Sequence, residues 1–312
     1  MKGFANMLKN ISRNKWFLLM VLPATIWFLL FSYLPMVGTI IAFKSYRYSR
    51  DGFWASLFQS DWVGFKNFKF LFATHDAYII TRNTLLYNLA FIILGLICSV
   101  AMAVVLSEIV NKKLAKVYQT GMFLPHFLSW VIIGYFAFAF LSEDKGVLNQ
   151  ILTGMGMHPI SWYSDKTYWP VILIVMNVWK ELGYTSVMYL AAIVGIDRSY
   201  YEAAMIDGAS KWQQFKNITL PAISPLIITL TLLNVGRIFY SDFGLFFQLP
   251  RDSGALYAVT NTIDTYVYRG LTATGEIGMS TAAGLYQSLV GFILVMAANL
   301  IVRRIDKDSS LF

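Results

Sequence analysis

Four long segments without a charged residue dominate the chain. They cover residues 16–43, 83–107, 117–142 and 277–302, and each has at least 25 residues. An α-helix rises 1.5 Å per residue, so about 20 apolar residues cross the hydrocarbon core of a bilayer. Each segment is therefore long enough to form a membrane-spanning helix.

Two further apolar segments contain charges. Residues 168–196 are apolar apart from Lys180 and Glu181, and residues 222–241 continue past Arg237. Both have about the length of a span. Together with the four uncharged segments, they predict an all-α integral membrane protein built as a bundle of six transmembrane helices.

An even number of spans places both ends of the chain on one side of the membrane. With cytoplasmic ends, the tails and inner loops hold 13 Lys and Arg residues and the outer loops hold 11. That excess, with a basic pair directly after the last apolar segment, favours this orientation under the positive-inside rule. We expect tail 1–15, loop 197–221 and tail 303–312 in the cytoplasm, and a transmembrane domain over residues 16–302.

The composition excludes several other classes of protein. The chain is 57% hydrophobic and 13% charged, about half the charged share of a typical soluble domain. Its net charge of +8 comes from residues that flank apolar segments, so we expect no nucleic-acid partner. The single Cys98 and the scattered histidines have no metal-ligand spacing. We therefore predict no disulfide, no metal site and no catalytic residue.

Residues 197–221 are predicted to form an elbow of two short helices. Two capping boxes pair Ser199 with Glu202 and Ser210 with Gln213. In a capping box, each side chain satisfies an unpaired backbone N–H at a helix start. Gly208 suits the left-handed cap at the end of the first helix, and the second helix is expected to end at about residue 217, ahead of a proline.

The elbow carries much apolar and aromatic area for a cytoplasmic loop. Its large apolar residues are Tyr200, Tyr201, Ile206, Trp212 and Phe215. Exposed apolar patches usually mark a docking surface, and the small Ala203 and Ala204 permit close approach of a partner. The alternative is that the loop packs on its own bundle.

The spacing of residues in this elbow resembles the EAA loop of the permease subunits of ABC importers. The matching positions are Glu202, Ala203, Ala204, Gly208, Ile218, Leu220 and Pro221. In that family the loop is a coupling helix seated in a cleft of a cytoplasmic ATPase. The resemblance implies this role for these residues and for Asp207, and it implies the type I importer permease fold.

Other segments resemble the carbohydrate permeases of this superfamily. They are Trp179-Lys180-Glu181-Leu182-Gly183-Tyr184, residues 124–130, residues 242–246 and Ser310-Leu311-Phe312. The last three are similar to the LplB-like branch, which is associated with uptake of oligo- and polysaccharides. The resemblance implies a sugar substrate, most simply an oligosaccharide, and a bacterial plasma membrane.

An importer needs an energy source, and the chain contains no G-x-x-x-x-G-K-[ST] phosphate-binding loop. ATP and its Mg²⁺ are therefore expected in a partner. The resemblance implies two copies of a cytoplasmic ATPase, a second homologous permease forming a heterodimer, and an extracytoplasmic solute-binding protein. ATP-driven closure of the ATPase would then move the bundle between outward-open and inward-open states.

Polar residues recur at helical spacing inside two predicted spans. The first stripe comprises Asn177, Lys180, Glu181 and Tyr184, with Trp179 beside it; the second comprises Asn234, Arg237 and Ser241, followed by Asp242. Charged residues inside a span nearly always face a bundle interior or a wet cavity. We expect both stripes to line one substrate pathway. The alternative is a structural ion pair, for example between Glu181 and Arg237.

Two rival functions remain at this stage. An ion-coupled secondary transporter could use Glu181 and Arg237 as coupling charges, but it should show inverted repeats and broken helix pairs in both halves. We detect neither. An intramembrane enzyme could use Glu181, Asp242 or His126, but the sequence offers no converging acid, base and nucleophile.

Overall fold

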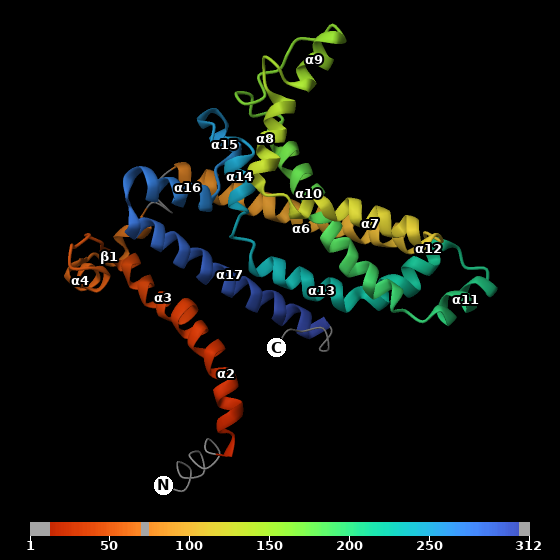
Figure 1. Ribbon diagram of the computed structural model, residues 1–312, viewed down its shortest axis with the longest axis horizontal. Helices are drawn as coiled ribbons and strands as arrows, with labels where there is room; N and C mark the ends of the chain where they lie inside the picture. Colours follow the sequence, from red (N-terminus) through yellow and green to blue (C-terminus); the bar gives the residue numbers. More distant parts are fainter. Residues whose placement is uncertain (1–12, 70–74, 306–312) are drawn as a thin grey trace.

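The computed structural model describes residues 13–69 and 75–305. The predicted tails 1–15 and 303–312 lie largely outside these residues, as does the Ser310-Leu311-Phe312 motif. The described chain is almost entirely helical, with five helices long and apolar enough to cross a membrane, or six if one bent pair is a single span. Long helices run side by side, and shorter elements gather at their ends (Figure 1).

The longest helices form the body of the molecule. They are α6 (His75–Ser107), α7 (Lys112–Phe127), α10 (Trp169–Val194), α13 (Leu220–Gly236) and α17 (Ile277–Ile305). α10 packs against α6 and α7, and α13 packs against α17. A cluster of buried side chains joins three of them: Val100, Ala103, Leu106, Tyr189, Leu190, Ile193 and Ile223. These contacts hold α6, α10 and α13 around a common centre.

The N-terminal helix extends away from this body (Figure 1). It runs through α2 (Lys15–Phe28), a π-helical turn, α3 (Leu34–Met36) and a 3₁₀ segment, Val37–Phe43. Residues 15–37 are all exposed, and only the 3₁₀ segment packs closely on α17. A largely apolar helix with no buried side chain from residue 15 to residue 37 has no partner among the described residues that covers it.

The predicted span at residues 117–142 was wrong as a single helix. α7 ends at Phe127, α8 (Trp130–Leu141) begins three residues later, and the two helices meet at 97°. Pro125 lies in the last turn of α7, where its ring and missing N–H weaken the hydrogen bonding of the preceding turn. Leu128 and Ser129 are extended, and the Ser129 hydroxyl accepts the N–H of Ile132 to start α8.

The fifth predicted span has different bounds from residues 222–241. One continuous helix runs from Lys211 through α12 (Lys211–Gln214), a π-helical turn (Phe215–Thr219) and α13. The wider π turn directly before Pro221 accommodates a residue that cannot donate its backbone N–H. The helix therefore does not end at about residue 217, and it stops at Gly236 with Arg237 as its C-cap.

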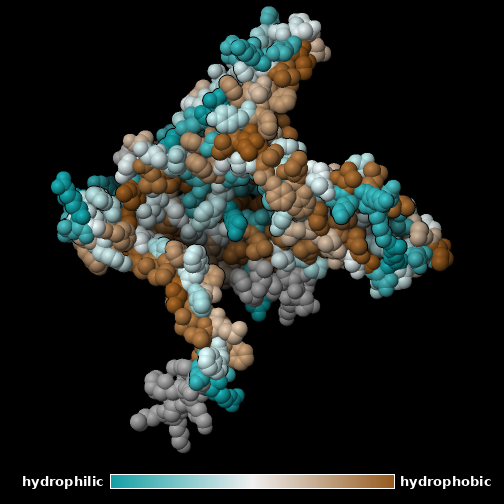
Figure 2. Space-filling model, viewed as in Figure 1, coloured by the Kyte–Doolittle hydropathy of each residue, from teal (hydrophilic) through white to brown (hydrophobic). Residues whose placement is uncertain are grey.

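Short elements complete the chain at two ends of the body. Toward one end lie the antiparallel pair β1 (Lys44–Ser45) and β2 (Asp61–Trp62), and the helices α4 (Phe53–Gln59), α14 (Phe243–Gln248), α15 (Tyr257–Thr260) and α16 (Ile263–Arg269), while α9 (Val147–Gly154) projects separately beyond α8 (Figure 1). The 3₁₀ and π segments there are Gly64–Phe68, Gly254–Leu256 and Gly270–Thr274. At the other end, α11 (Arg198–Ile206) follows α10 (Figure 1). Apolar surface covers much of the long helices, and hydrophilic side chains show in a hollow near the centre (Figure 2).

Candidate functional site

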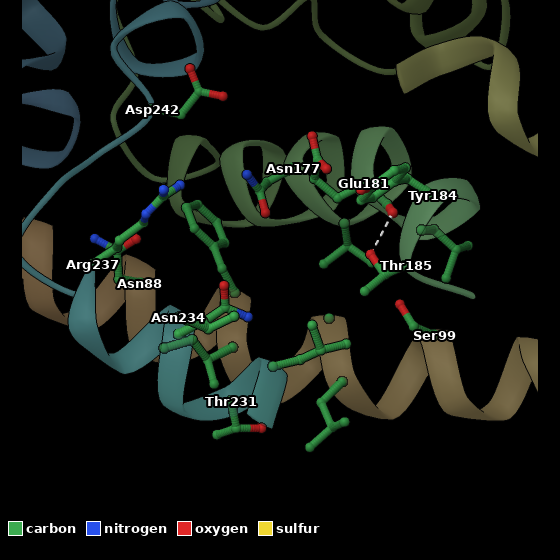
Figure 3. A pocket seen from close by; sticks show the side chains of 18 of the residues that line it. Asn88, Ser99, Asn177, Glu181, Tyr184, Thr185, Thr231, Asn234, Arg237 and Asp242 are labelled. Atoms are coloured by element: carbon green, nitrogen blue, oxygen red, sulfur yellow. Dashed lines mark hydrogen bonds between the residues drawn. The ribbon is translucent and has the colours of Figure 1, made fainter. Parts of the chain in front are cut away.

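A polar cavity of about 730 Å³ lies between α6, α10 and α13. Its polar and charged lining residues are Asn88, Ser99, Asn177, Glu181, Tyr184, Thr185, Thr231, Asn234, Arg237, Ser241 and Asp242 (Figure 3). Its volume falls in the range of about 300–1,000 Å³ that is usual for small-molecule sites. Each of the three helices contributes polar groups, so the cavity exists only when they pack together.

Most of the residues predicted for a substrate pathway meet at this cavity. Those that line it are Asn177, Glu181, Tyr184, Asn234, Arg237 and Asp242. Ser241 and Asp242 reach the cavity from the linker after α13, because that helix ends at Gly236. Trp179 and Lys180 do not line it, and both predictions are corrected here.

Lys180 faces α7. Its side chain is buried, and Nζ donates to the carbonyl oxygens of Pro125 (3.4 Å), His126 (2.7 Å) and Leu128 (2.9 Å). These carbonyls lie at the break between α7 and α8, where a helix end leaves acceptors without partners. Nζ also lies 5.5 Å from the ring centre of Trp130. The cation therefore stabilises the bend.

The helical period explains why Lys180 leaves the polar stripe. Lys180 and Gly183 are three residues apart and share the edge of α10 that contacts α7. A Cβ at Gly183 would lie 1.9 Å from the carbonyl oxygen of Met122, so only glycine permits this approach. Trp179 lies on another face and lines an apolar groove between α8 and α10, which also includes Ile133 and Phe136.

Glu181 has a different partner from the one considered in the sequence. Its Oε2 lies 3.3 Å from Nδ1 of His126, at the end of α7. The His126 ring stacks on Tyr184, with ring centres 4.7 Å apart. Among the described residues, Arg237 makes no ion pair with Glu181. The alternative of a structural Glu181–Arg237 pair is therefore wrong.

Asp242 combines a wall position with a structural role. One carboxylate oxygen accepts the indole N–H of Trp130, and the other accepts the backbone N–H of Leu245 at the start of α14. Gly244 lies so close that a Cβ there would meet the Trp130 ring at 2.3 Å. Within the described residues, no three His, Cys, Asp or Glu side chains are placed to hold a metal ion.

The α6 wall was missed in the sequence. Asn88 lies in the uncharged segment 83–107, and its side-chain amide donates to the carbonyls of Ile238 (3.0 Å) and Tyr240 (2.9 Å). It thereby holds the linker after α13 against the cavity. The sequence signal for this wall of the cavity was an asparagine and serines within an apolar segment. Their spacing does not indicate which neighbouring helix they face.

The predicted elbow is present, with two corrections. α11 is capped by Asp197, whose side chain accepts the N–H of Ser199, so the expected Ser199–Glu202 capping box is wrong. Hydrogen bonds from the backbone N–H and then the hydroxyl of Ser199 hold the pKa of Asp197 below its usual value. The second capping box, Ser210 with Gln213, is confirmed, and Gly208 is left-handed with φ of 76°.

The predicted coupling residues divide between two elements. Glu202, Ala203 and Ala204 lie on α11, and Asp207 and Gly208 follow directly; Ile218, Leu220 and Pro221 lie on the continuous helix from Lys211. α11 has no buried residue, and its Ile206 is 87% exposed. This apolar face has no partner among the described residues.

Two contacts link α11 to the body through the continuous helix that begins at Lys211. The hydroxyl of Tyr201 lies 2.9 Å from that of Thr219, and Lys211 Nζ contacts both carboxylate oxygens of Glu108 at the end of α6. The first contact connects α11 to the helix that continues as α13, and the second connects that helix to the end of α6; both helices line the cavity. A cavity with polar groups between helices long enough to span a membrane, together with an exposed apolar face on α11, is the arrangement of a membrane transport subunit.

Sequence comparison gives the family. Residues 91–307 match the family described as binding-protein-dependent transport system inner membrane component. The chain belongs to this family, and it is a permease subunit of an ABC importer whose ATPase is a separate chain.

Relatives agree over almost the whole length. Protein LplB of Bacillus subtilis (strain 168) is 35% identical, over 96% of this chain and 92% of that protein. The polygalacturonan/rhamnogalacturonan transport system permease protein YteP of the same organism is 33% identical, over 97% and 92%. A chain of a bacterial importer of the acidic polysaccharide alginate superposes with a TM-score of 0.87 at 33% identity, over 96% of this chain and 99% of that chain. The alginate importer in complex with its pentasaccharide-bound periplasmic protein gives 0.85 at 34% identity, over 96% and 98%.

Proposed function

We propose that this subunit moves an oligosaccharide inward through the cavity between α6, α10 and α13. The observation that carries the proposal is the convergence of amide, hydroxyl, charged and aromatic groups from three helices on one space. Sugars present hydroxyls that bond amides and carboxylates, and apolar faces that pack on aromatic rings. The transported molecules in the names of YteP and the alginate importer support the sugar class.

Energy enters through the elbow. α11 presents an exposed, largely apolar face with small residues at Ala203 and Ala204, which suits insertion into a groove of a cytoplasmic ATPase. ATP and Mg²⁺ bind in that ATPase. Its closure displaces α11, and the Tyr201 and Lys211 contacts pass the movement to the bundle.

A second permease covers the N-terminal helix. Residues 15–37 leave every side chain exposed, and an apolar helix of that length gains stability by packing on another transmembrane chain. We infer a heterodimer with a homologous permease, two ATPase copies, and an extracytoplasmic solute-binding protein at the α14 end. Both termini and the α11 elbow then face the cytoplasm of a bacterial cell.

Uptake into proteoliposomes tests the function. The purified complex, with its binding protein, should import oligosaccharide only when ATP is supplied to the ATPase side. Import that continues without ATP, and stops when an ion gradient is dissipated, would establish the ion-coupled alternative. Product release without net import would indicate an intramembrane enzyme. Native mass spectrometry of the complex should give one copy of this chain with one other permease and two ATPases.

The variant Glu202→Lys tests the coupling surface. We expect substrate-stimulated ATP hydrolysis and retention of the ATPase to fall about tenfold or more, the size of effect found at interface hot spots. Glu276→Lys, an exposed charge reversal outside the elbow, is the matched control and should change neither. Wild-type coupling in Glu202→Lys would show that this part of α11 is not the docking surface.

A further inference from the structure

Among the described residues, three charged side chains line the cavity, and one of them has no ion-pair or hydrogen-bond partner. Asp242 accepts hydrogen bonds from Trp130 and Leu245, and Glu181 Oε2 lies 3.3 Å from His126 Nδ1. The third is Arg237, at the end of α13. A guanidinium without a partner distinguishes this cavity from a polar core whose charges only stabilise the fold.

The backbone of Arg237 is committed, but its side chain is free among the described residues. Its N–H donates to the carbonyl of Asn234, and its carbonyl accepts from Tyr240. Its guanidinium makes no ion pair or hydrogen bond within the described part of the chain. The residue lines the cavity and is exposed. Five N–H donors therefore point into the space without an acceptor.

Two neighbouring amides share this condition. The side chains of Asn177 on α10 and Asn234 on α13 line the same cavity and bond no other described side chain or backbone group. In the close view, both lie on the Arg237 side of the cavity, away from Ser99 (Figure 3). The region thus offers one cationic fork beside two groups that can each donate and accept.

This set of donors has a specific chemical complement. A guanidinium matches the two oxygens of a carboxylate with parallel hydrogen bonds, and such charge-assisted pairs are about twice as strong as neutral ones. Amides bond hydroxyls in both directions. A group that carries a carboxylate and adjacent hydroxyls on one ring is a uronic acid.

We propose that Arg237, flanked by Asn177 and Asn234, is a carboxylate-binding subsite, and that the transported oligosaccharide contains uronic acid residues. This inference rests on the proposed function of the cavity. The ligand carboxylate would supply the partner that a cation within a membrane bundle otherwise lacks, since isolated charges at that depth are unfavourable. Asn88 donates hydrogen bonds to the linker after α13, and these bonds hold Arg237 at one position in the cavity wall.

Matched acidic and neutral probes test the subsite. Oligogalacturonate and oligomannuronate of three residues, and their fully methyl-esterified forms, differ in charge but not in length or hydroxyl pattern. Uptake of each is measured in proteoliposomes with wild type, Arg237→Gln and Arg237→Lys. The same binding protein serves every variant, so its own selectivity cancels when the acid-to-ester uptake ratio of a variant is divided by that of the wild type.

We expect Arg237→Gln to lower the acid-to-ester ratio about tenfold or more, as loss of a charge-assisted pair predicts. Arg237→Lys should keep an intermediate ratio, because it retains the charge and loses the fork. Arg47→Gln, which removes an exposed arginine paired with Asp61 on the surface, should match the wild type.

Two results would refute the subsite, and a third would refute the proposed function instead. An acid-to-ester ratio that Arg237→Gln leaves unchanged, or wild-type import of the neutral esters alone, refutes carboxylate binding at Arg237. Absence of ATP-driven uptake for every saccharide in wild type refutes the proposed function instead. Misfolding of a variant would lower uptake of the acid and of the ester equally. Thermal unfolding of each purified variant identifies such a loss.

Discussion

Replacing Lys180 by Met tests whether a buried cation holds the break between α7 and α8. The His126 and Leu128 carbonyls accept from Nζ at normal distances, whereas Pro125 O also receives the backbone N–H of Leu128. Two acceptors are therefore left unsatisfied. At about 1–3 kcal/mol for each buried group, the loss is about 2–6 kcal/mol.

The same substitution removes a cost. An ammonium group at mid-helix in a membrane is unfavourable by about 2.5–3.5 kcal/mol on insertion scales. The uncharged Met side chain avoids this cost. The two effects largely cancel, so the free energy of unfolding should fall by only about 1 kcal/mol. The local effect does not cancel, because nothing else bridges the three carbonyls.

Hydrogen–deuterium exchange of the detergent-solubilised complex distinguishes local from global change. In Lys180→Met, amides from residue 125 to residue 135 should exchange faster, and transport should fall, while the unfolding temperature changes by a few degrees at most. Lys166→Met, an exposed lysine in a loop, is the control. Wild-type exchange at the break together with wild-type uptake would refute the assignment of this role to the cation.

Three further substitutions follow from the packing. Gly183→Ala should destabilise the protein by about 1–3 kcal/mol in thermal unfolding, because its Cβ meets the Met122 backbone, whereas Gly121→Ala on α7 has open space and should not. In a double-mutant cycle of Glu108→Ala and Lys211→Ala, the coupling should stay below about 1 kcal/mol, as for exposed ion pairs; a larger value would mean that the pair is shielded from water. Asp242→Ala removes the α14 cap and the Trp130 acceptor and should lower stability by about 1–2 kcal/mol, unlike Asp242→Asn, which keeps a capping side chain; equal losses would show that charge, not capping, matters.

Local patterns along the chain were sufficient to predict the membrane class, the family and the elbow. Apolar length is a local property, so segments of 25 or more residues without a charge predicted the spans, although residues 117–142 form two helices that meet at 97°. The elbow was also readable, since capping and left-handed glycine are decided by residues a few positions apart. Ser210 caps a helix and Gly208 is left-handed, as their local chemistry predicts. Asp197 replaces Ser199 as the first cap, because it lies two residues earlier and its side chain accepts the Ser199 N–H.

The roles of the charges within the helices depend on tertiary packing. Helical spacing placed Lys180 with Glu181 and Tyr184, yet a difference of one position on α10 is a rotation of about 100°. That rotation puts Lys180 against the open carbonyls of α7 and leaves Glu181 and Tyr184 at the cavity. The carbonyls exist because α7 breaks at Leu128, and the unpartnered state of Arg237 depends on where α13 ends. Both depend on contacts between segments far apart in the chain, which periodicity within one helix cannot encode.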